Sequence, residues 1–270
     1  MAPYQTTQQF WRDTALPWLE VRNVLDGRTV CYAPHTHETF SIGAIVGGTS
    51  TYLNEKTQIQ IHAGAVVLMN PGVLHACNPV QDQPWAYRMF YFDSRWLNQL
   101  LGDNDDNICH FTQTWSDSPT LFTGLNQLYD VVTNDQCDVL EKECAAAQFM
   151  MQAQQELCAK TLVSSGAPQQ LAPAIDKIHQ QYDEPLTLSS LAQEANLSVS
   201  HLIRLCQQHY GVTPHALLMN RRLHMAREQL KRGDALANVA LASGFADQAH
   251  FQRAFKQHFA VTPKQYRDLL

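Results

Sequence analysis

Apolar and polar positions follow different periods in different parts of this 270-residue chain. Between about Trp18 and Asp93, short runs of β-branched and aromatic residues are separated by turn residues such as Gly47-Gly48 and the Asn-Pro-Gly stretch at 70–72. Many short strands at this spacing predict an all-β barrel or sandwich. The strand candidates are residues 40–46, 59–61, 66–69 and 85–92.

Residues 119–162 have a helical period instead. Leu121, Leu125 and Leu128 recur at i, i+4 and i+7, which predicts an apolar stripe on a helix. A second stripe contains Leu140, Cys144, Ala147, Met151 and Cys158. Two such helices can pack as an antiparallel pair or against the same pair of a second subunit. We therefore expect this segment to hold a homodimer together.

The helical pattern returns after a short segment, 164–170, that is rich in Ser, Gly, Pro and Gln and is typical of a linker. The predicted organisation has four parts. They are a β barrel at 1–118, a helical dimerisation segment at 119–163, a linker at 164–171 and an all-α domain at 172–270.

The all-α part contains an internal repeat. Residues 201–214 recur as 250–263, with seven of fourteen positions identical at an offset of 49. This identity indicates two copies of one supersecondary unit. Each copy has the pattern of a helix-turn-helix, with Asn196 and Gly244 in the tight turns. A helix from Pro214 to about Arg232 would join the two copies.

The second helix of such a unit enters the DNA major groove and contacts base edges, where Arg pairs with guanine and Gln with adenine. Placing the apolar residues inward leaves a polar face on each helix. It contains Ser200, His201 and Arg204 in the first copy, and Gln248, His250, Gln252 and Arg253 in the second. The two histidines have a structural alternative, in which they only pack. Phosphate contacts are expected from Arg221, Arg222, Arg227, Lys231, Arg232, Lys256 and Lys264.

Net charge alone argues against nucleic acid, because the chain carries 25 acidic and 19 basic residues, a net charge of −6. The charge is unevenly distributed, however. Residues 1–171 hold 8 basic and 17 acidic side chains, whereas residues 172–270 hold 11 and 8. The C-terminal part is thus mildly basic, so the DNA prediction depends on the repeat rather than on charge.

A second candidate site lies in the β-rich part. His35 and His37 are two residues apart before one strand, and His75 and Cys77 are two apart after another, so each pair can share a face. Three imidazoles and one thiolate match a closed tetrahedral Zn²⁺ site. Glu38 is out of phase and would join the set only through a bend. The alternative is that the histidines only form hydrogen bonds at the barrel mouth.

Cysteine usage and the N-terminus bear on the compartment. The seven cysteines are scattered and include no C-x-x-C, which favours reduced thiols in a cytoplasm. The first residues contain neither a basic nor an apolar signal region, and no apolar run approaches the roughly 20 residues of a membrane helix. We expect a cytoplasmic protein that does not interact with membranes.

Residues 172–267 resemble the DNA-binding module of AraC/XylS-type transcription regulators, most clearly at 244–256 and 261–267. The resemblance implies recognition helices in successive major grooves, with Ser200, Arg204, Gln248 and Arg253 at base-contacting positions. The β-rich part is similar to the cupin-like domain of the same regulators, although Glu38 is displaced from the usual metal pattern. This similarity implies a small effector in the barrel, and the family implies RNA polymerase as a partner.

Arg88 lies among aromatic residues of a predicted strand, next to Tyr87, and can bind a ligand carboxylate through a bidentate pair. The sequence as a whole predicts a non-enzymatic transcription regulator, an activator or a repressor, that senses an amino acid, another carboxylate or a metal, and binds double-stranded DNA. The alternative is a metal-dependent cupin enzyme with a helical appendage. A catalytic metal keeps an open coordination position, which a set closed by Cys77 lacks.

Overall fold

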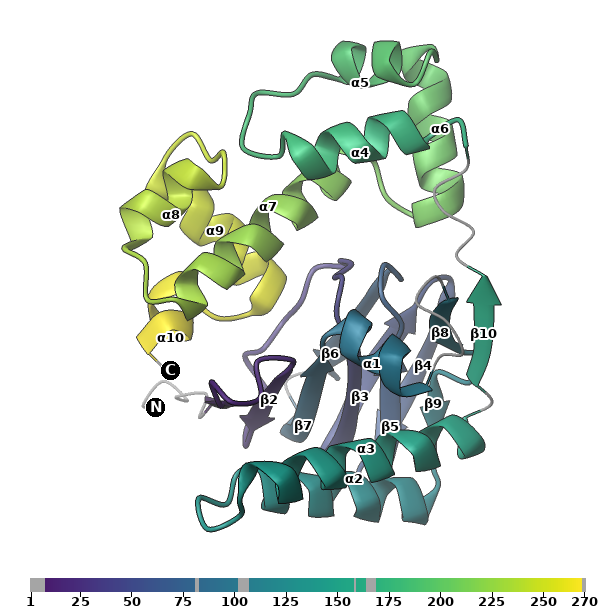
Figure 1. The fold of residues 1–270 in the computed structure, drawn as a ribbon, viewed down its shortest axis with the longest axis vertical. Coiled ribbons are helices and arrows are strands. Elements are labelled where there is room, and N and C mark those ends of the chain that lie inside the picture. The colour runs from purple at the N-terminus through teal and green to yellow at the C-terminus, as the bar shows by residue number, and fades with distance from the viewer. Residues whose placement is uncertain (1–7, 81–82, 102–106, 158, 164–168, 269–270) are drawn as a thin grey trace. The chain divides into compact units, whose positions relative to one another are not determined.

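The computed structural model describes residues 8–80, 83–101, 107–157, 159–163 and 169–268 (Figure 1). The chain forms two compact units that divide after Ser164. The first contains the strands and the first three helices. The second contains the remaining helices and also a short segment from the N-terminal part, Tyr32–His37.

The first unit is an antiparallel β structure organised around one long strand, β3 (Phe40–Asn54). The first half of β3 pairs with β7 (Trp85–Phe92) and β5 (Val66–Met69), and its second half pairs with β4 (Thr57–His62) and β6 (His75–Pro79). The register shifts between Ile45 and Gly47, and Gly48 follows with a φ of 71°. A Cβ at Gly48 would lie 1.9 Å from the Pro84 carbonyl oxygen, so this close approach requires glycine. The other strands of the two linked sheets are β1 (Gln8–Arg12), β2 (Leu19–Val24) and β9 (Trp115–Ser116).

Helices cover one face of this sheet (Figure 1). Alternate residues of the strands, such as Ile42 and Phe90, share a core with Leu121 and Leu125 of the helices. These leucines are buried because their i, i+4 spacing places them on one side of the helix. The helical pair is thus part of the core of the β unit. The helices are α1 (Ser94–Leu101), α2 (Pro119–Val132) and α3 (Val139–Glu156).

The structure corrects the predicted end of the helical segment. The chain leaves α3 at Leu157, and Ala159–Val163 forms a strand, β10, instead of more helix. This strand pairs with β8 (Asn107–Phe111) in a small antiparallel sheet. A five-residue stretch too short for its own helix thus gains its hydrogen bonds from a distant strand, a pairing that local periodicity does not predict.

Helix α3 buries a different face from the one that its sequence pattern suggests. Lys142, Ala146, Phe149, Met150 and Ala153 are buried. The predicted stripe lies elsewhere: the side chains of Leu140 and Met151 are 67% and 50% exposed, and Cys144 is exposed too. Cys158, its last predicted member, lies outside the described residues.

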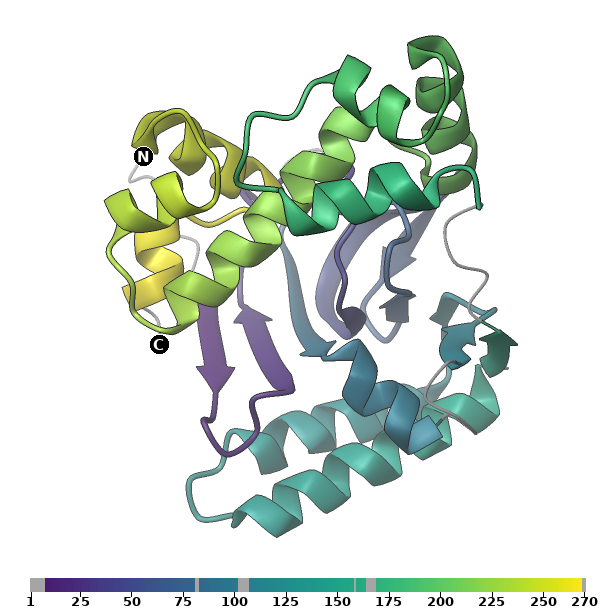
Figure 2. The same cartoon turned by 45° about the horizontal axis from the view of Figure 1, so that its top comes forward.

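The second unit consists of two helix-turn-helix copies joined by one long helix (Figure 2). This arrangement confirms the interpretation of the internal repeat. None of the helices in the described ranges combines the length and the apolar character needed to cross a membrane. The helices are α4 (Ala172–Gln180), α5 (Leu188–Glu194), α6 (Val199–Tyr210), the joining helix α7 (Pro214–Lys231), α8 (Leu236–Ala242), α9 (Gln248–Phe259) and α10 (Pro263–Asp268).

Local caps and turns determine where these helices begin and end. Thr187 forms a capping box with Ser190, and the side chains of Ser198 and Thr213 accept hydrogen bonds from the first turns of α6 and α7. Asn196 and Gly244 have φ angles of 53° and 74°, as expected for the predicted tight turns. A Cβ at Gly244 would lie 2.8 Å from the Asp183 backbone, so a larger residue does not fit there.

The recognition helices of the two copies end at equivalent positions with different residues. Gly211 ends α6 and Ala260 ends α9, with φ angles of 70° and 53°. The left-handed conformation costs a residue with a Cβ roughly 1–2 kcal/mol. Ala260 is therefore a strained C-cap, whereas Gly211 is not.

Ala260→Gly should raise the free energy of unfolding of the helical unit by about 1 kcal/mol, because it removes that strain at a small cost in chain entropy. Gly211→Ala, at the equivalent position, should lower it by a similar amount. Chemical denaturation followed by circular dichroism measures both changes. An Ala260→Gly variant no more stable than the natural protein would contradict the strained cap.

Candidate DNA-binding surface and effector pocket

The first recognition helix, α6, exposes most of the side chains that the sequence places at the DNA. Ser200 and Arg204 are exposed one turn apart, whereas Leu202 and Cys206 are buried in the core of this copy. His201 is half-buried between these two faces. The N-terminal half of α6 therefore presents a hydroxyl and a guanidinium outward.

The second recognition helix, α9, presents an equivalent face. Gln248, Gln252 and Arg253 are exposed, whereas Phe251 and Phe255 are fully buried. Asp247 caps the helix by accepting a hydrogen bond from the His250 backbone N–H, and hydrogen bonds of this kind lower the pKa of its carboxyl group. The His250 ring packs edge-on against Phe245, with centroids 5.4 Å apart, which favours the structural alternative for this histidine.

Five of the seven basic residues expected at DNA phosphates fall into two groups. Arg227 is buried and its Nε donates a hydrogen bond to the Tyr266 hydroxyl. Arg222 donates to the backbone carbonyls of Tyr182 and Glu184, so it holds the loop before α5 in place. These two guanidinium groups stabilise the fold through hydrogen bonds within the protein. Arg232, Lys256 and Lys264 are exposed and remain candidates for phosphate contacts.

The predicted zinc ligands are divided between the two units. His35 and His37 belong to the segment Tyr32–His37, whereas His75 and Cys77 lie on β6 of the first unit. His35 and His75 each donate a hydrogen bond from Nδ1 to the backbone carbonyl two residues earlier, at 2.8 Å. In a neutral ring this hydrogen bond places the proton on Nδ1 rather than on Nε2. Burial lowers the pKa of His35 to about 4, so its ring is neutral at neutral pH.

Cys77 and Glu38 have contrasting surroundings. Cys77 is buried on the same face of β6 as His75, opposite Tyr52 in register. Burial raises the pKa of the Cys77 thiol to about 12, so the thiol is protonated unless a metal ion displaces the proton. The Glu38 side chain is exposed.

Arg88 and Tyr87, the predicted ligand-binding pair, lie on opposite faces of β7. The Arg88 guanidinium lies 4.0 Å from the ring centroid of Tyr129 and donates a hydrogen bond to the Asn126 side chain, both on α2. It thus holds α2 against the sheet, which favours a structural role for it. Tyr87 is buried and stacks on Trp85, with centroids 4.5 Å apart.

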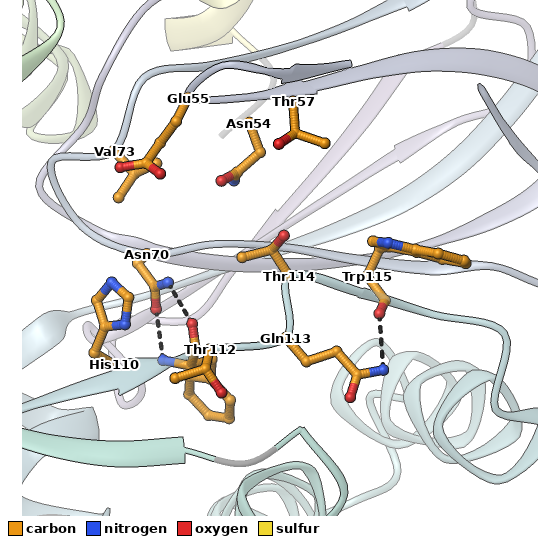
Figure 3. Close-up of a pocket in the computed structure, with 11 residues that line it drawn as sticks. Asn54, Glu55, Thr57, Asn70, Val73, His110, Thr112, Gln113, Thr114 and Trp115 are labelled. Atoms are coloured by element: carbon orange, nitrogen blue, oxygen red, sulfur yellow. Dashed lines mark hydrogen bonds between the residues drawn. The ribbon is translucent and has the colours of Figure 1, made fainter. Parts of the chain in front are cut away.

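The first unit also contains a polar pocket of about 450 Å³, a size typical of small-molecule sites (Figure 3). Asn54, Glu55 and Thr57 lie on one side of it, and His110, Thr112 and Gln113 lie on the other. The remaining lining residues are Asn70, Val73, Phe111, Thr114 and Trp115.

Buried hydrogen bonds hold the walls of this pocket. The Asn70 side chain bonds both the N–H and the carbonyl of Phe111, at 3.0 and 2.9 Å. Asn54 donates from Nδ2 to the Tyr52 hydroxyl, which in turn donates to the Leu68 carbonyl. Burial lowers the pKa of His110 below its usual value, although the Glu55 carboxylate partly opposes this shift.

Sequence reasoning missed this pocket because separate segments of the chain supply its walls. The end of β3 and the turn after it supply Asn54 and Glu55, whereas the end of β8, the start of β9 and the connection between them supply residues 110–115. The one local signal is a polar Asn-Glu pair at the tip of a hairpin. That pair is equally typical of an ordinary turn.

The chain has two exposed recognition helices in tandem and a β-rich unit that carries a pocket. This combination is typical of DNA-binding regulators that have a ligand-binding domain. Family models agree with this assignment: residues 191–268 match a helix-turn-helix domain, and residues 25–150 match the AraC-like ligand binding domain. The HTH-type transcriptional activator RhaS of Pectobacterium carotovorum is 30% identical over 246 residues, covering 87% of this chain and 88% of RhaS. The chain belongs to the AraC family of transcription regulators.

Two further proteins extend the comparison. The raffinose operon regulatory protein RafR of Pediococcus pentosaceus is 24% identical over 255 residues, covering 89% of this chain and 91% of RafR. The crystal structure of ToxT from Vibrio cholerae O395 superimposes with a TM-score of 0.60 at 12% identity, covering 98% of this chain and 97% of ToxT. This likeness supports the two-domain fold, with a β-rich domain followed by a helical one.

Proposed function

We propose that this AraC-family protein binds a specific DNA site as a homodimer and changes its DNA occupancy when the β-rich unit binds an effector. The observation that carries this proposal is the pair of matching recognition helices. Each exposes an arginine one turn from its start, Arg204 and Arg253, beside smaller hydrogen-bonding side chains. The effector acts because it binds one arrangement of the protein more tightly than another.

RNA polymerase is the proposed partner of the DNA-bound protein, because relatives such as RhaS are named transcriptional activators. The proposed location is the cytoplasm, because the proposed partner is chromosomal DNA. We propose no catalytic activity, since the relatives named above are regulators. A carboxylate effector stays a prediction, and Arg88, its expected partner, is engaged by α2.

Arg204→Ala and Arg253→Ala should each reduce discrimination at one base pair by about 1–3 kcal/mol, because a bidentate guanine contact is lost. The DNA site is first selected from random duplexes with the natural protein, and binding to single-base variants is then measured by fluorescence anisotropy. Arg232→Ala, an exposed arginine beyond α7, is the control and should weaken binding equally for all sequences. A failure to select any specific site would contradict the proposed function.

The dimer would form through the exposed apolar face of α3. Leu140 and Met151 lie three turns apart on this face, with Cys144 between them, and the two ends of the stripe are at least half exposed. An apolar stripe of this kind can pack against the same stripe of a second copy about a two-fold axis. We therefore name a second copy of this chain as its occupant.

Leu140→Glu combined with Met151→Glu should convert the dimer to a monomer, because each charge would be buried without a partner in the interface. Sedimentation equilibrium measures the mass. Leu241→Glu, at a leucine that is 78% exposed on α8, is the matched control and should leave the dimer intact. A dimer that persists in the double variant would show that another surface holds the subunits.

Metal binding is a further part of the proposal. The sequence spacing supports it, because His35 and His37, and His75 and Cys77, each lie two residues apart, and three imidazoles with one thiolate form the donor set of a tetrahedral Zn²⁺ site. The backbone carbonyls that accept from Nδ1 of His35 and His75 support this proposal, because metal-binding histidines are commonly oriented in this way.

Zinc should bind the purified protein at one equivalent and should be lost in His37→Ala and His75→Ala, as measured by elemental analysis after dialysis. His62→Ala, at an exposed histidine on β4, is the control and should retain the metal. Chelation that abolishes the effector response but not DNA binding indicates sensing, whereas a large fall in melting temperature indicates a structural metal. Natural protein that cannot be loaded with zinc would refute the site.

A further inference from the structure

Equivalent histidines in the two helix-turn-helix copies have different surroundings. His209 and His258 occupy the same position of the internal repeat, in the last turns of α6 and α9. His209 is exposed, whereas His258 is only 6% exposed. The second copy therefore has packing at the end of its recognition helix that the first copy does not have at this position.

Part of this packing comes from the segment Tyr32–His37, which belongs to the helical unit although it precedes β3 in the chain. The His35 ring lies against the His258 ring, with centroids 4.5 Å apart. Contacts within the segment hold the His35 ring in this place. Tyr32 stacks on it, with centroids 5.7 Å apart, and the Ala33 carbonyl accepts a hydrogen bond from its Nδ1. The segment thus presents an ordered surface to α9.

Hydrogen bonds also join this segment to the helices. The Ala33 N–H donates to the Gln257 carbonyl at 3.4 Å, and this carbonyl is among the last four of α9, which have no partner within the helix. Asn220, on α7, donates from Nδ2 to the Thr36 hydroxyl at 2.5 Å. Thr36 is buried, so little water competes for this bond. The segment therefore contacts the recognition helix and the joining helix together.

The two recognition helices differ in how much they need such support. Helix α6 ends at Gly211, which adopts the left-handed conformation without strain. Helix α9 ends at Ala260, whose Cβ makes the same conformation unfavourable. Contacts from the segment Tyr32–His37 stabilise the end that has the less favourable cap.

We propose that the segment Tyr32–His37 positions the second recognition helix for base recognition, and that the Asn220–Thr36 hydrogen bond anchors it. The segment contacts the C-terminal end of α9, whereas bases are contacted from the N-terminal half of such a helix. A recognition helix that is held in one orientation loses less entropy when it binds its bases. The inference rests on the proposed function, because it requires that α9 contacts DNA.

The selected DNA site and its single-base variants test this role in the full-length protein. Base pairs read by α9 are those at which Arg253→Ala loses discrimination, and base pairs read by α6 are those at which Arg204→Ala does. Thr36→Val and Asn220→Ala should each reduce discrimination at the α9 base pairs by about two-fold to ten-fold, the range for one lost hydrogen bond. Discrimination at the α6 base pairs should not change.

Conservative and matched variants serve as controls. Thr36→Ser keeps the hydroxyl group and should discriminate as well as the natural protein. Thr120→Val, at an exposed threonine on α2, is the matched control for Thr36→Val and should also bind normally. The double variant of Thr36→Val and Asn220→Ala should lose no more than either single variant, because both changes remove the same bond. Melting curves confirm that each variant is folded.

Hydrogen exchange measures how firmly α9 is held in the absence of DNA. Amides in the last turn of α9 should exchange about two-fold to ten-fold faster in Thr36→Val and Asn220→Ala, whereas those of α6 should not change. Unchanged exchange in α9 would overturn the inference. Faster exchange with unchanged discrimination at the α9 base pairs would overturn it as well.

The remaining outcomes separate general destabilisation and the proposed function from this inference. An equal loss of discrimination at the α6 and α9 base pairs would show general destabilisation and contradict a role specific to α9. Additive losses in the double variant would contradict the assigned anchor. Failure to select any specific DNA site would overturn the proposed function itself, and hydrogen exchange would still decide whether the segment holds α9.

Discussion

The backbone pairing of β3 is the constraint on which the β-rich unit depends. A strand of fifteen residues has too many hydrogen-bonding groups for one partner, and β3 satisfies them with four strands along its length. Its first half supplies Phe40 and Ile42 to the core beneath α2 and α3. Its second half ends at Asn54, in the wall of the polar pocket. One strand thus determines where the helical pair and the pocket lie.

The helical unit follows a different principle, the repetition of one motif. Both copies place aromatic or aliphatic residues inward and leave polar residues outward on the second helix, so each copy presents a similar surface to DNA. The joining helix contributes stability as well as spacing. Arg222 and Arg227 use their guanidinium groups inside the fold, and this explains why its basic residues are not all available to phosphates.

Sequence reasoning succeeded where the determinants are local. The caps at Thr187 and Ser198 and the left-handed turn at Asn196 follow from residues within a few positions of one another. The exposed positions of α6 and α9 follow from helical periodicity in the same way. Sequence reasoning failed to predict the buried face of α3. Apolar residues occur on two faces of that helix, and only packing against the sheet determines which face is covered. It also failed for Ala159–Val163, whose partner strand is about fifty residues away.

The sequence by itself determined the family, the repeated helix-turn-helix and the candidate base-contacting residues, since each rests on short-range patterns or a specific motif. Only the tertiary structure decided the surroundings of single side chains. Arg88 has an apolar and aromatic neighbourhood in the sequence, yet α2 binds its guanidinium. Glu55, His110 and Trp115 have no shared motif, yet they line one pocket. Such neighbours come together only when distant segments pack, because burial and hydrogen bonding act through space rather than along the chain.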